Sequence, residues 1–207
     1  MAEKVRVAVL ISGRGSNMLA LAEHKRRDPD RAYDIALVAS NVPEARGLVL
    51  AKRLGLATWA LSHKGMERAD FDLKLDAALR EHDIELVALA GYMRLLSGAF
   101  VERWAGRILN VHPSLLPLYK GLDTHRRALL AGEEYAGCSV HLVTDDLDSG
   151  PVIAQTRVRI RPRDDPESLA ARVLKAEHAL YPVAVEEYAR AMREETGFAS
   201  TDGPDKE

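Results

Sequence analysis

The chain has 207 residues, 47% apolar and 29% charged, which fits one α/β domain with a sizeable core. Its 29 basic and 31 acidic side chains leave a net charge of −2, which gives no general attraction to nucleic acid or an anionic membrane. Cys138 is the only cysteine, so no internal disulfide can form. Residues 5–11 are too short and too interrupted for a signal peptide. We therefore expect a cytoplasmic monomer or homodimer whose partners are small molecules.

The N-terminal half alternates short apolar strands with helices. We expect strands at 5–11, 35–40, 57–61 and 86–90, and helices at 18–27, 45–54, 69–80 and 98–104, the last capped by Ser97. Uninterrupted apolar strands that alternate with helices are typical of parallel sheets covered on both faces. The pattern predicts an α/β fold with an open, mostly parallel, Rossmann-like sheet.

The C-terminal half changes character after a strand at 108–111 and a loop bounded by proline at 113–121. We expect a helix at 124–131 and a hairpin of strands at 138–143 and 152–160, which adds a C-terminal antiparallel strand. A last helix should begin with Pro166 at its first position and run to about His178, with Pro182 kinking or restarting it. Residues 1–195 then form a single domain, and 196–207 read as a disordered tail.

A glycine-rich turn, Gly13–Asn17, separates the first strand from the first helix. A tight turn that needs glycine is the simplest interpretation. A dinucleotide site would require a third glycine where Met18 stands, and an acid at the end of the next strand, where Ser40 and Asn41 stand. A nucleoside-triphosphate loop would require Gly-Lys-Ser/Thr, which is absent. The functional reading that remains is a cradle for one phosphate at a helix N-terminus, with no nicotinamide cofactor.

Asn110 and His112 are two positions apart at the end of a predicted strand, so both side chains should leave the same face. They would project beyond the carboxyl ends of the strands, where open α/β sheets bind ligands. An amide beside an imidazole can polarise a carbonyl and stabilise an oxyanion. Asp148 lies in a turn-rich loop between two strands, where an Asx-turn is the simpler explanation. If its carboxylate meets His112, it should orient the ring and raise its pKa.

Other reactive side chains form no recognised pattern. Ser139 and His141 share one face of their strand, whereas Cys138 points to the other face, which disfavours a Cys–His pair. Ser114 lacks the G-x-S-x-G elbow of a nucleophilic serine. The histidines and the cysteine have no metal-ligand spacing, so we expect no metal.

Five motifs resemble the folate-dependent formyltransferases, and specifically the members that serve purine biosynthesis. Asn110-Val-His-Pro-Ser-Leu-Leu-Pro117, followed by Gly-Leu-x-Thr-His-Arg-Arg-Ala-Leu, carries the strongest likeness. The others are the stretches 9–17, 89–97, 139–153 and 177–182. The resemblance runs in order from about residue 4 to 190.

The resemblance implies an enzyme that transfers the formyl group of 10-formyltetrahydrofolate, its co-substrate, to the amine of glycinamide ribonucleotide. It implies that Asn110 and His112 stabilise the oxyanion, with His112 as proton donor. Asp148 would keep His112 protonated and relay the amine's proton through water.

The resemblance also implies a substrate site and a folate site. The substrate site would be Gly15, Ser16 and Asn17 at the phosphate, and Glu177 at the sugar or glycinamide end. The folate pocket would include Asn110, Asp148 and the residues Arg68, Met93, Arg94, Leu95 and Leu96. The phosphate-binding half would then be about 1–105, and the catalytic and folate-binding half about 106–195.

Three positions depart from the family pattern, and three alternatives stay open. Asp123 stands where a histidine is common, Lys120 where a proline is common, and Leu174 at a polar, phosphate-holding position beside Lys175. A formyltetrahydrofolate hydrolase would require an N-terminal regulatory domain, and a methionyl-tRNA formyltransferase would require a basic C-terminal domain. A catalytically idle phosphosugar-binding module is the third alternative.

Overall fold

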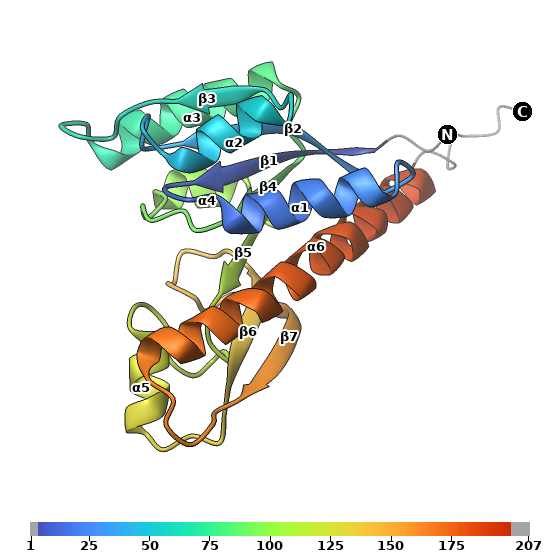
Figure 1. The fold of residues 1–207 in the computed structure, drawn as a ribbon. Coiled ribbons are helices and arrows are strands. Elements are labelled where there is room, and N and C mark those ends of the chain that lie inside the picture. The colour runs from blue at the N-terminus through green and yellow to red at the C-terminus, as the bar shows by residue number, and fades with distance from the viewer. Residues whose placement is uncertain (1–3, 200–207) are drawn as a thin grey trace, which may run out of the picture.

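The computed structural model describes residues 4–199, and within them one sheet has the order β3-β2-β1-β4-β5-β6-β7 (Figure 1). The strands are β1 (Val5–Ile11), β2 (Tyr33–Ser40), β3 (Thr58–Ala60), β4 (Leu86–Leu89), β5 (Ile108–His112), β6 (Tyr135–Leu142) and β7 (Val152–Arg159). The helices are α1 (Ser16–Arg27), α2 (Arg46–Arg53), α3 (Arg68–Glu81), α4 (Gly98–Arg103), α5 (Thr124–Leu130) and α6 (Pro166–Ala199).

The sheet is parallel from β3 to β5 and antiparallel from β5 to β7. Both the parallel Rossmann-like part and the C-terminal hairpin are therefore confirmed. The strand order reverses at β1, which lies between β2 and β4. Ligands of open α/β sheets bind at such a switch point, outside the carboxyl ends of the strands.

Helices cover both faces of the sheet, as the continuous apolar strands predict. One core cluster joins one face to α1, α2 and α6 through residues such as Met18, Leu48 and Val173. A second joins the other face to α3 and α4 through Phe71 and Phe100. Figure 1 shows α1 and α6 side by side over the first of these faces.

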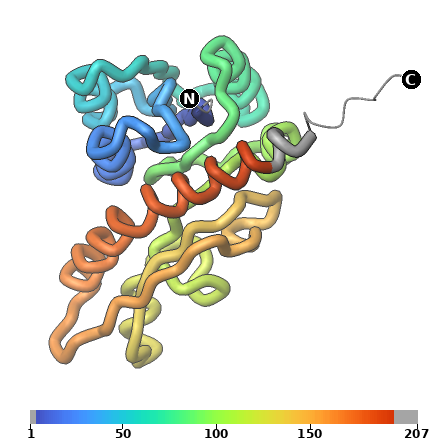
Figure 2. Tube along the Cα trace, turned by 90° about the vertical axis from the view of Figure 1, so that its right-hand side faces the viewer, coloured from blue at the N-terminus to red at the C-terminus, as the bar shows by residue number. Residues whose placement is uncertain are grey.

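The long helix α6 corrects one expectation. It runs without interruption from Pro166 to Ala199, with Pro182 inside it, and does not end near His178. A proline removes one helical hydrogen bond, but Tyr181 and Val185 beside it are fully buried. This packing holds the helix across the sheet, and Figure 2 shows it running between the N-terminal elements and the β6–β7 hairpin. Tertiary burial outweighs the local break.

Two boundaries also differ from expectation. The first helix begins at Ser16 and not at Met18, so Ser16 and Asn17 belong to its first turn. The last helix extends past position 196, where a tail was expected to begin. Positions 200–207 of that expected tail lie outside the described residues. In the part of the chain that the structure describes, no helix has the length and apolar character needed to cross a membrane.

Candidate active site

Asn110 and His112 lie on one face of β5, as their spacing predicts. Their neighbours Leu109 and Val111 belong to the core beneath α6, whereas Ile108 belongs to the core beneath α3 and α4. Side chains alternate along a strand, so Asn110 and His112 face the α3–α4 side. His112 is 5% exposed, and it stands at the carboxyl end of the last strand of the parallel part.

Asp148 reaches this face from the loop between β6 and β7. Its Oδ2 lies 3.3 Å from Nδ1 of His112 and accepts a 2.9 Å hydrogen bond from the backbone N–H of Gly121. Asp148 has φ of 48°, a left-handed conformation that is uncommon for a residue with a Cβ atom. The sequence predicted this pair from chemistry, and the structure brings the two groups together.

The ring of His112 contacts an acceptor at each nitrogen. Nε2 lies 3.0 Å from the carbonyl oxygen of Tyr119, and Nδ1 faces Asp148. Both contacts favour the charged ring, yet burial is the larger effect and lowers the pKa of His112 below its ordinary value. The carboxylate of Asp148 thus acts in the expected direction, but the removal of the ring from water has the larger effect, so the net shift of the His112 pKa is downward.

Asp148 is ionised at neutral pH. Burial by itself raises the pKa of this carboxyl group, but the His141 ring, the Gly121 N–H and His112 together hold it below its ordinary value. The site thus contains a buried carboxylate that is anionic beside a histidine that loses its proton readily.

His141 is a site residue that the sequence analysis did not select. It pairs with Asn110 across β5 and β6, and its Nε2 lies 3.1 Å from Nδ2 of Asn110 and 3.6 Å from Oδ1 of Asp148. Its Nδ1 lies 2.8 Å from the carbonyl oxygen of Leu142, so both ring nitrogens have polar neighbours. The shared face of Ser139 and His141 was visible in the sequence, but their register against β5 was not.

The glycine turn packs tightly against the start of α2. Gly15 has φ of 74°, and a Cβ atom there would lie 2.8 Å from the Cα of Gly47. The N–H of Gly47 donates to the carbonyl oxygen of Gly13 at 3.0 Å. Gly15 caps α1 without any side-chain hydrogen bond, and the first turn of α1 contains no acidic residue. The N–H groups of a first helical turn have no acceptor within the helix, and they suit an anion.

Asn17 and Glu177 meet beside this turn. Nδ2 of Asn17 donates a 2.7 Å hydrogen bond to the carboxylate of Glu177, and both side chains are buried. Burial raises the pKa of Glu177, although the bond from Asn17 opposes the shift. The Oδ1 atom of Asn17 is buried without a hydrogen-bond partner. This pair therefore presents one unsatisfied polar atom, Oδ1 of Asn17, next to the anion cradle.

The stretch Met93–Leu96 follows β4 and leaves two apolar side chains open to solvent. Met93 is 73% exposed and Leu95 is 54% exposed, which suits a surface that covers a flat ligand. The guanidinium of Arg94 instead stacks over the Phe71 ring at 5.2 Å and contacts the carbonyl oxygen of Met66 at 3.3 Å. Leu96 packs against the core.

Arg68 is exposed at the first position of α3 and takes no part in the contacts that join Asn110, His112, His141 and Asp148. Of the positions that depart from the family pattern, Lys120 donates a 2.7 Å hydrogen bond to Ser149 beside Asp148. Asp123 is the residue before α5, with φ of 56°. Leu174 and Lys175 lie on α6 near Glu177 in sequence, and Lys175 is exposed.

Among the described residues, no group of three or more His, Cys, Asp or Glu could hold a metal ion.

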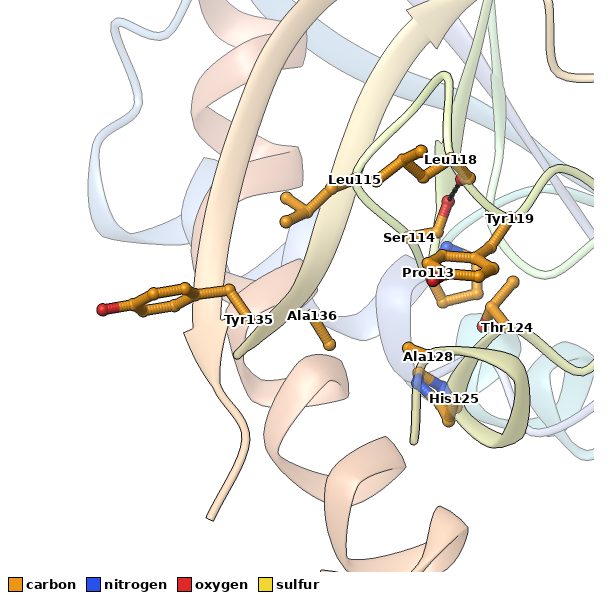
Figure 3. A pocket seen from close by; sticks show the side chains of 10 residues that line it. All are labelled: Pro113, Ser114, Leu115, Leu118, Tyr119, Thr124, His125, Ala128, Tyr135 and Ala136. Carbon is orange, nitrogen blue, oxygen red and sulfur yellow. Dashed lines mark hydrogen bonds between the residues drawn. The ribbon is translucent and has the colours of Figure 1, made fainter. Parts of the chain in front are cut away.

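A small pocket opens beneath the loop that follows β5 (Figure 3). Its walls come from this loop, α5 and the start of β6: Pro113, Ser114, Leu115, Leu118, Tyr119, Thr124, His125, Ala128, Tyr135 and Ala136. The Ser114 hydroxyl donates a 2.6 Å bond across the loop to the carbonyl oxygen of Leu118. None of the predicted catalytic or binding residues lines this pocket. We treat it as a packing gap behind the loop that presents Tyr119 to His112.

A family model described as formyl transferase matches residues 5–185. The chain belongs to the formyl transferase family. Asn110, His112 and Asp148 all lie within the matched region of this formyl transferase. Its likeness to the family in sequence therefore agrees with the fold and with the position of the site at the carboxyl end of the sheet.

Named relatives of this formyl transferase fall into two groups. The trifunctional purine biosynthetic protein adenosine-3 of Homo sapiens is 44% identical over 185 residues, which are 89% of this chain and 18% of that protein. The chain thus spans less than a fifth of that protein's length. The phosphoribosylglycinamide formyltransferase of Escherichia coli (strain K12) is 43% identical over 186 residues, which are 89% of this chain and 87% of that protein.

Solved structures agree with the family fold. The phosphoribosylglycinamide formyltransferase from Brucella melitensis is 48% identical, with a TM-score of 0.86 over 90% of this chain and 96% of that one. The glycinamide ribonucleotide transformylase 1 from Symbiobacterium toebii is 39% identical, with a TM-score of 0.87 over 91% of this chain and 89% of that one.

Proposed function

We propose that this protein transfers the formyl group of 10-formyltetrahydrofolate to the amine of glycinamide ribonucleotide in purine biosynthesis. The observation that carries the proposal is the contact of His112 with Asp148 beside Asn110, which shares the same face of β5, in a formyl transferase. Relatives that this chain matches over most of their length are named phosphoribosylglycinamide formyltransferase, which supports the choice of acceptor.

The chemistry begins with attack of the amine lone pair on the formyl carbon, which sends the carbonyl electrons to oxygen. Asn110 can donate to this oxyanion, because its Nδ2 carries two hydrogens and only one of them can face His141. In its protonated form His112 carries a second N–H, on Nδ1, besides the one that faces the carbonyl oxygen of Tyr119 at 3.0 Å, and this second N–H can donate to the oxyanion. Donors that are placed in advance where charge develops usually make the largest contribution to such reactions.

Two proton transfers complete the exchange. The attacking nitrogen loses a proton through water to the Asp148 carboxylate, which is ionised at neutral pH. The bond from carbon to N10 of the folate then breaks, and N10 takes a proton from the imidazolium form of His112, which becomes the neutral ring. Asp148, 3.3 Å from Nδ1 of His112, returns the proton to the ring. The products are the formylated ribonucleotide and tetrahydrofolate, and no net proton is gained or lost by the protein.

The substrate phosphate is assigned to the glycine turn. Gly15, Ser16 and Asn17 offer backbone N–H groups and a helix N-terminus without acidic side chains. Glu177, held by Asn17, is assigned to the sugar hydroxyls or the glycinamide group, whose donors can satisfy a buried carboxylate. Leu174 offers the phosphate no polar group, so α6 contributes less here than in members with a polar residue at that position.

The folate is assigned to the surface formed by Met93–Leu96 and the 144–148 loop. The two segments lie close together, since a Cβ on Gly98, just beyond the first, would lie 3.3 Å from Asp145. The exposed apolar side chains of Met93 and Leu95 suit a pterin ring, while Asn110 and Asp148 face its formyl group. Arg68, exposed at the start of α3, is assigned to the glutamate carboxylates.

We place the activity in the cytoplasm, where folate cofactors and a free cysteine are both compatible with reducing conditions.

The test is a spectrophotometric assay of 10-formyltetrahydrofolate consumption with and without glycinamide ribonucleotide. We expect turnover that depends strictly on the ribonucleotide. Turnover without it would favour a hydrolase, and absence of turnover with it would refute the transferase proposal. Addition of methionyl-tRNA in place of the ribonucleotide tests the remaining formyltransferase alternative.

A further inference from the structure

The side chain of Ser12 joins the glycine turn to the segment after β4. Ser12 lies between β1 and Gly13. Its Oγ accepts a 2.7 Å hydrogen bond from the N–H of Met93 and donates a 2.6 Å bond to Oδ1 of Asn41. Its own N–H donates to the carbonyl oxygen of Gly91 at 3.1 Å. One residue therefore connects the carboxyl ends of three neighbouring strands, β1, β2 and β4.

Asn41 fixes the direction of the Ser12 hydroxyl. Asn41 is 2% exposed, and its carbonyl oxygen lies 2.8 Å from Nδ1 of His63. A hydroxyl has a single hydrogen, so donation to Asn41 leaves the lone pairs of Oγ toward the N–H of Met93. A dinucleotide-binding fold would use an acid at this strand end to bind ribose. Here the corresponding amide is turned inward and holds Ser12.

In the segment Met93–Leu96, Ser12 holds the main chain at Met93, whereas Phe71 and Met66 hold only the side chain of Arg94. The side chains of Met93 and Leu95 are largely exposed and bury little surface that could fix their main chain. At the far end of the segment, the N–H of Ser97 donates to Asp72 at 2.6 Å. Ser12 is the matching anchor at the near end.

We infer that Ser12 is a positioning residue, which sets the distance between the folate-binding segment and the phosphate-binding turn. The inference rests on the proposed function, in which the formyl donor lies on the first element and the amine acceptor on the second. Attack requires reacting atoms about 3–3.5 Å apart, and a displacement of about 1 Å can cost on the order of a hundredfold in rate. Ser12 touches neither reactant in this scheme.

The experiment compares Ser12→Ala, Ser12→Cys and Ser12→Thr with wild type. Steady-state assays give kcat, and calorimetry gives the dissociation constants for glycinamide ribonucleotide and for an unreactive folate analogue, each alone. For Ser12→Ala we expect kcat to fall on the order of 10- to 100-fold, with both dissociation constants within about twofold of wild type. Ser12→Cys keeps about the same side-chain volume, but a thiol is a weak hydrogen-bonding group. This variant should therefore show the same loss of kcat, and it replaces Ser12→Ala in the test if Ser12→Ala does not fold. Ser12→Thr keeps the hydroxyl and should recover most of the lost turnover.

Ser40→Ala is the matched control, because the Ser40 hydroxyl is buried at the end of β2 and bonds only within its own turn, to Val42. We expect this variant to keep kcat near wild type. Three outcomes would each overturn the inference. The first is a wild-type kcat in Ser12→Cys, and the second is a loss that weaker binding of either ligand explains. The third is that Ser12→Thr recovers no turnover. Failure of the wild-type protein to formylate the ribonucleotide would instead refute the proposed function.

Discussion

Asn17 and Glu177 are 160 positions apart in the chain, yet the amide of one donates a 2.7 Å hydrogen bond to the carboxylate of the other. Asn17 lies in the first turn of α1 and Glu177 lies midway along α6. The contact couples the glycine turn to the long C-terminal helix. It also holds an acid in a buried position, where its charge is costly.

Glu177→Gln should stabilise the protein at neutral and higher pH. Burial raises the pKa of Glu177, so the folded state keeps this proton to higher pH than the unfolded state. The residue's contribution to the free energy of unfolding therefore falls as pH rises from about 4.3, the unfolded value, through the raised folded pKa. Glutamine cannot ionise but still offers Asn17 an oxygen.

Urea denaturation checks this at about pH 8 and about pH 4, below the unfolded pKa. The variant should be more stable than wild type at the higher pH, and the difference should vanish at the lower one. Glu187→Gln, an exposed site on the same helix, should show no such pH-dependent gain. Equal stability of Glu177→Gln and wild type at the higher pH would contradict the prediction.

His112→Ala should lower kcat on the order of a hundredfold or more, because it removes an oxyanion donor and a proton donor. The measurement is steady-state formyl transfer at saturating substrates. His82→Ala serves as control, since His82 follows α3 and its ring bonds to the Ala78 carbonyl oxygen. A loss of less than about fivefold in His112→Ala would remove this residue from the chemistry.

Asp148→Asn should abolish turnover while both substrates still bind. The amide can still accept the N–H of Gly121, so the loop should keep its place, but it cannot take a proton or stabilise charge on His112. We expect kcat to fall at least on the order of a hundredfold, by analogy with loss of the carboxylate beside other catalytic histidines. Calorimetric titration with glycinamide ribonucleotide should give a near-normal dissociation constant. Near-normal turnover would exclude Asp148 from the mechanism.

Gly15→Ala should destabilise the fold and weaken substrate binding. A left-handed conformation costs a residue with a Cβ atom roughly 1–2 kcal/mol, and here the added atom would also lie 2.8 Å from the Gly47 backbone. Gly55→Ala separates the two effects, because Gly55 has φ of 75° and open space around its Cβ position.

Denaturation midpoints should show Gly55→Ala less affected than Gly15→Ala, and only Gly15→Ala should raise KM for the ribonucleotide. Equal losses in the two variants would mean that the close approach of Gly15 to Gly47 contributes nothing beyond backbone strain.

Much of the fold could be predicted from local patterns. The apolar runs of β1 and β4 are bounded by turn residues, and the Asp165-Pro166 start of α6 follows from the rules for helix N-termini. The end of that helix could not be predicted, because Pro182 is a local break and Tyr181 and Val185 are held by tertiary burial. Predictions from propensity are least secure where local and long-range preferences conflict.

The sequence by itself determined that Asn110 and His112 share a face, because strand periodicity is a local property of the backbone. It also excluded the dinucleotide pattern at the glycine turn. Only the tertiary structure decided that Asp148 reaches His112, that His141 holds Asn110, and that burial lowers the pKa of His112. These three findings depend on strand register, on the approach of a distant loop and on the removal of water. Each is set by groups that are far apart in the chain and meet only in the folded protein.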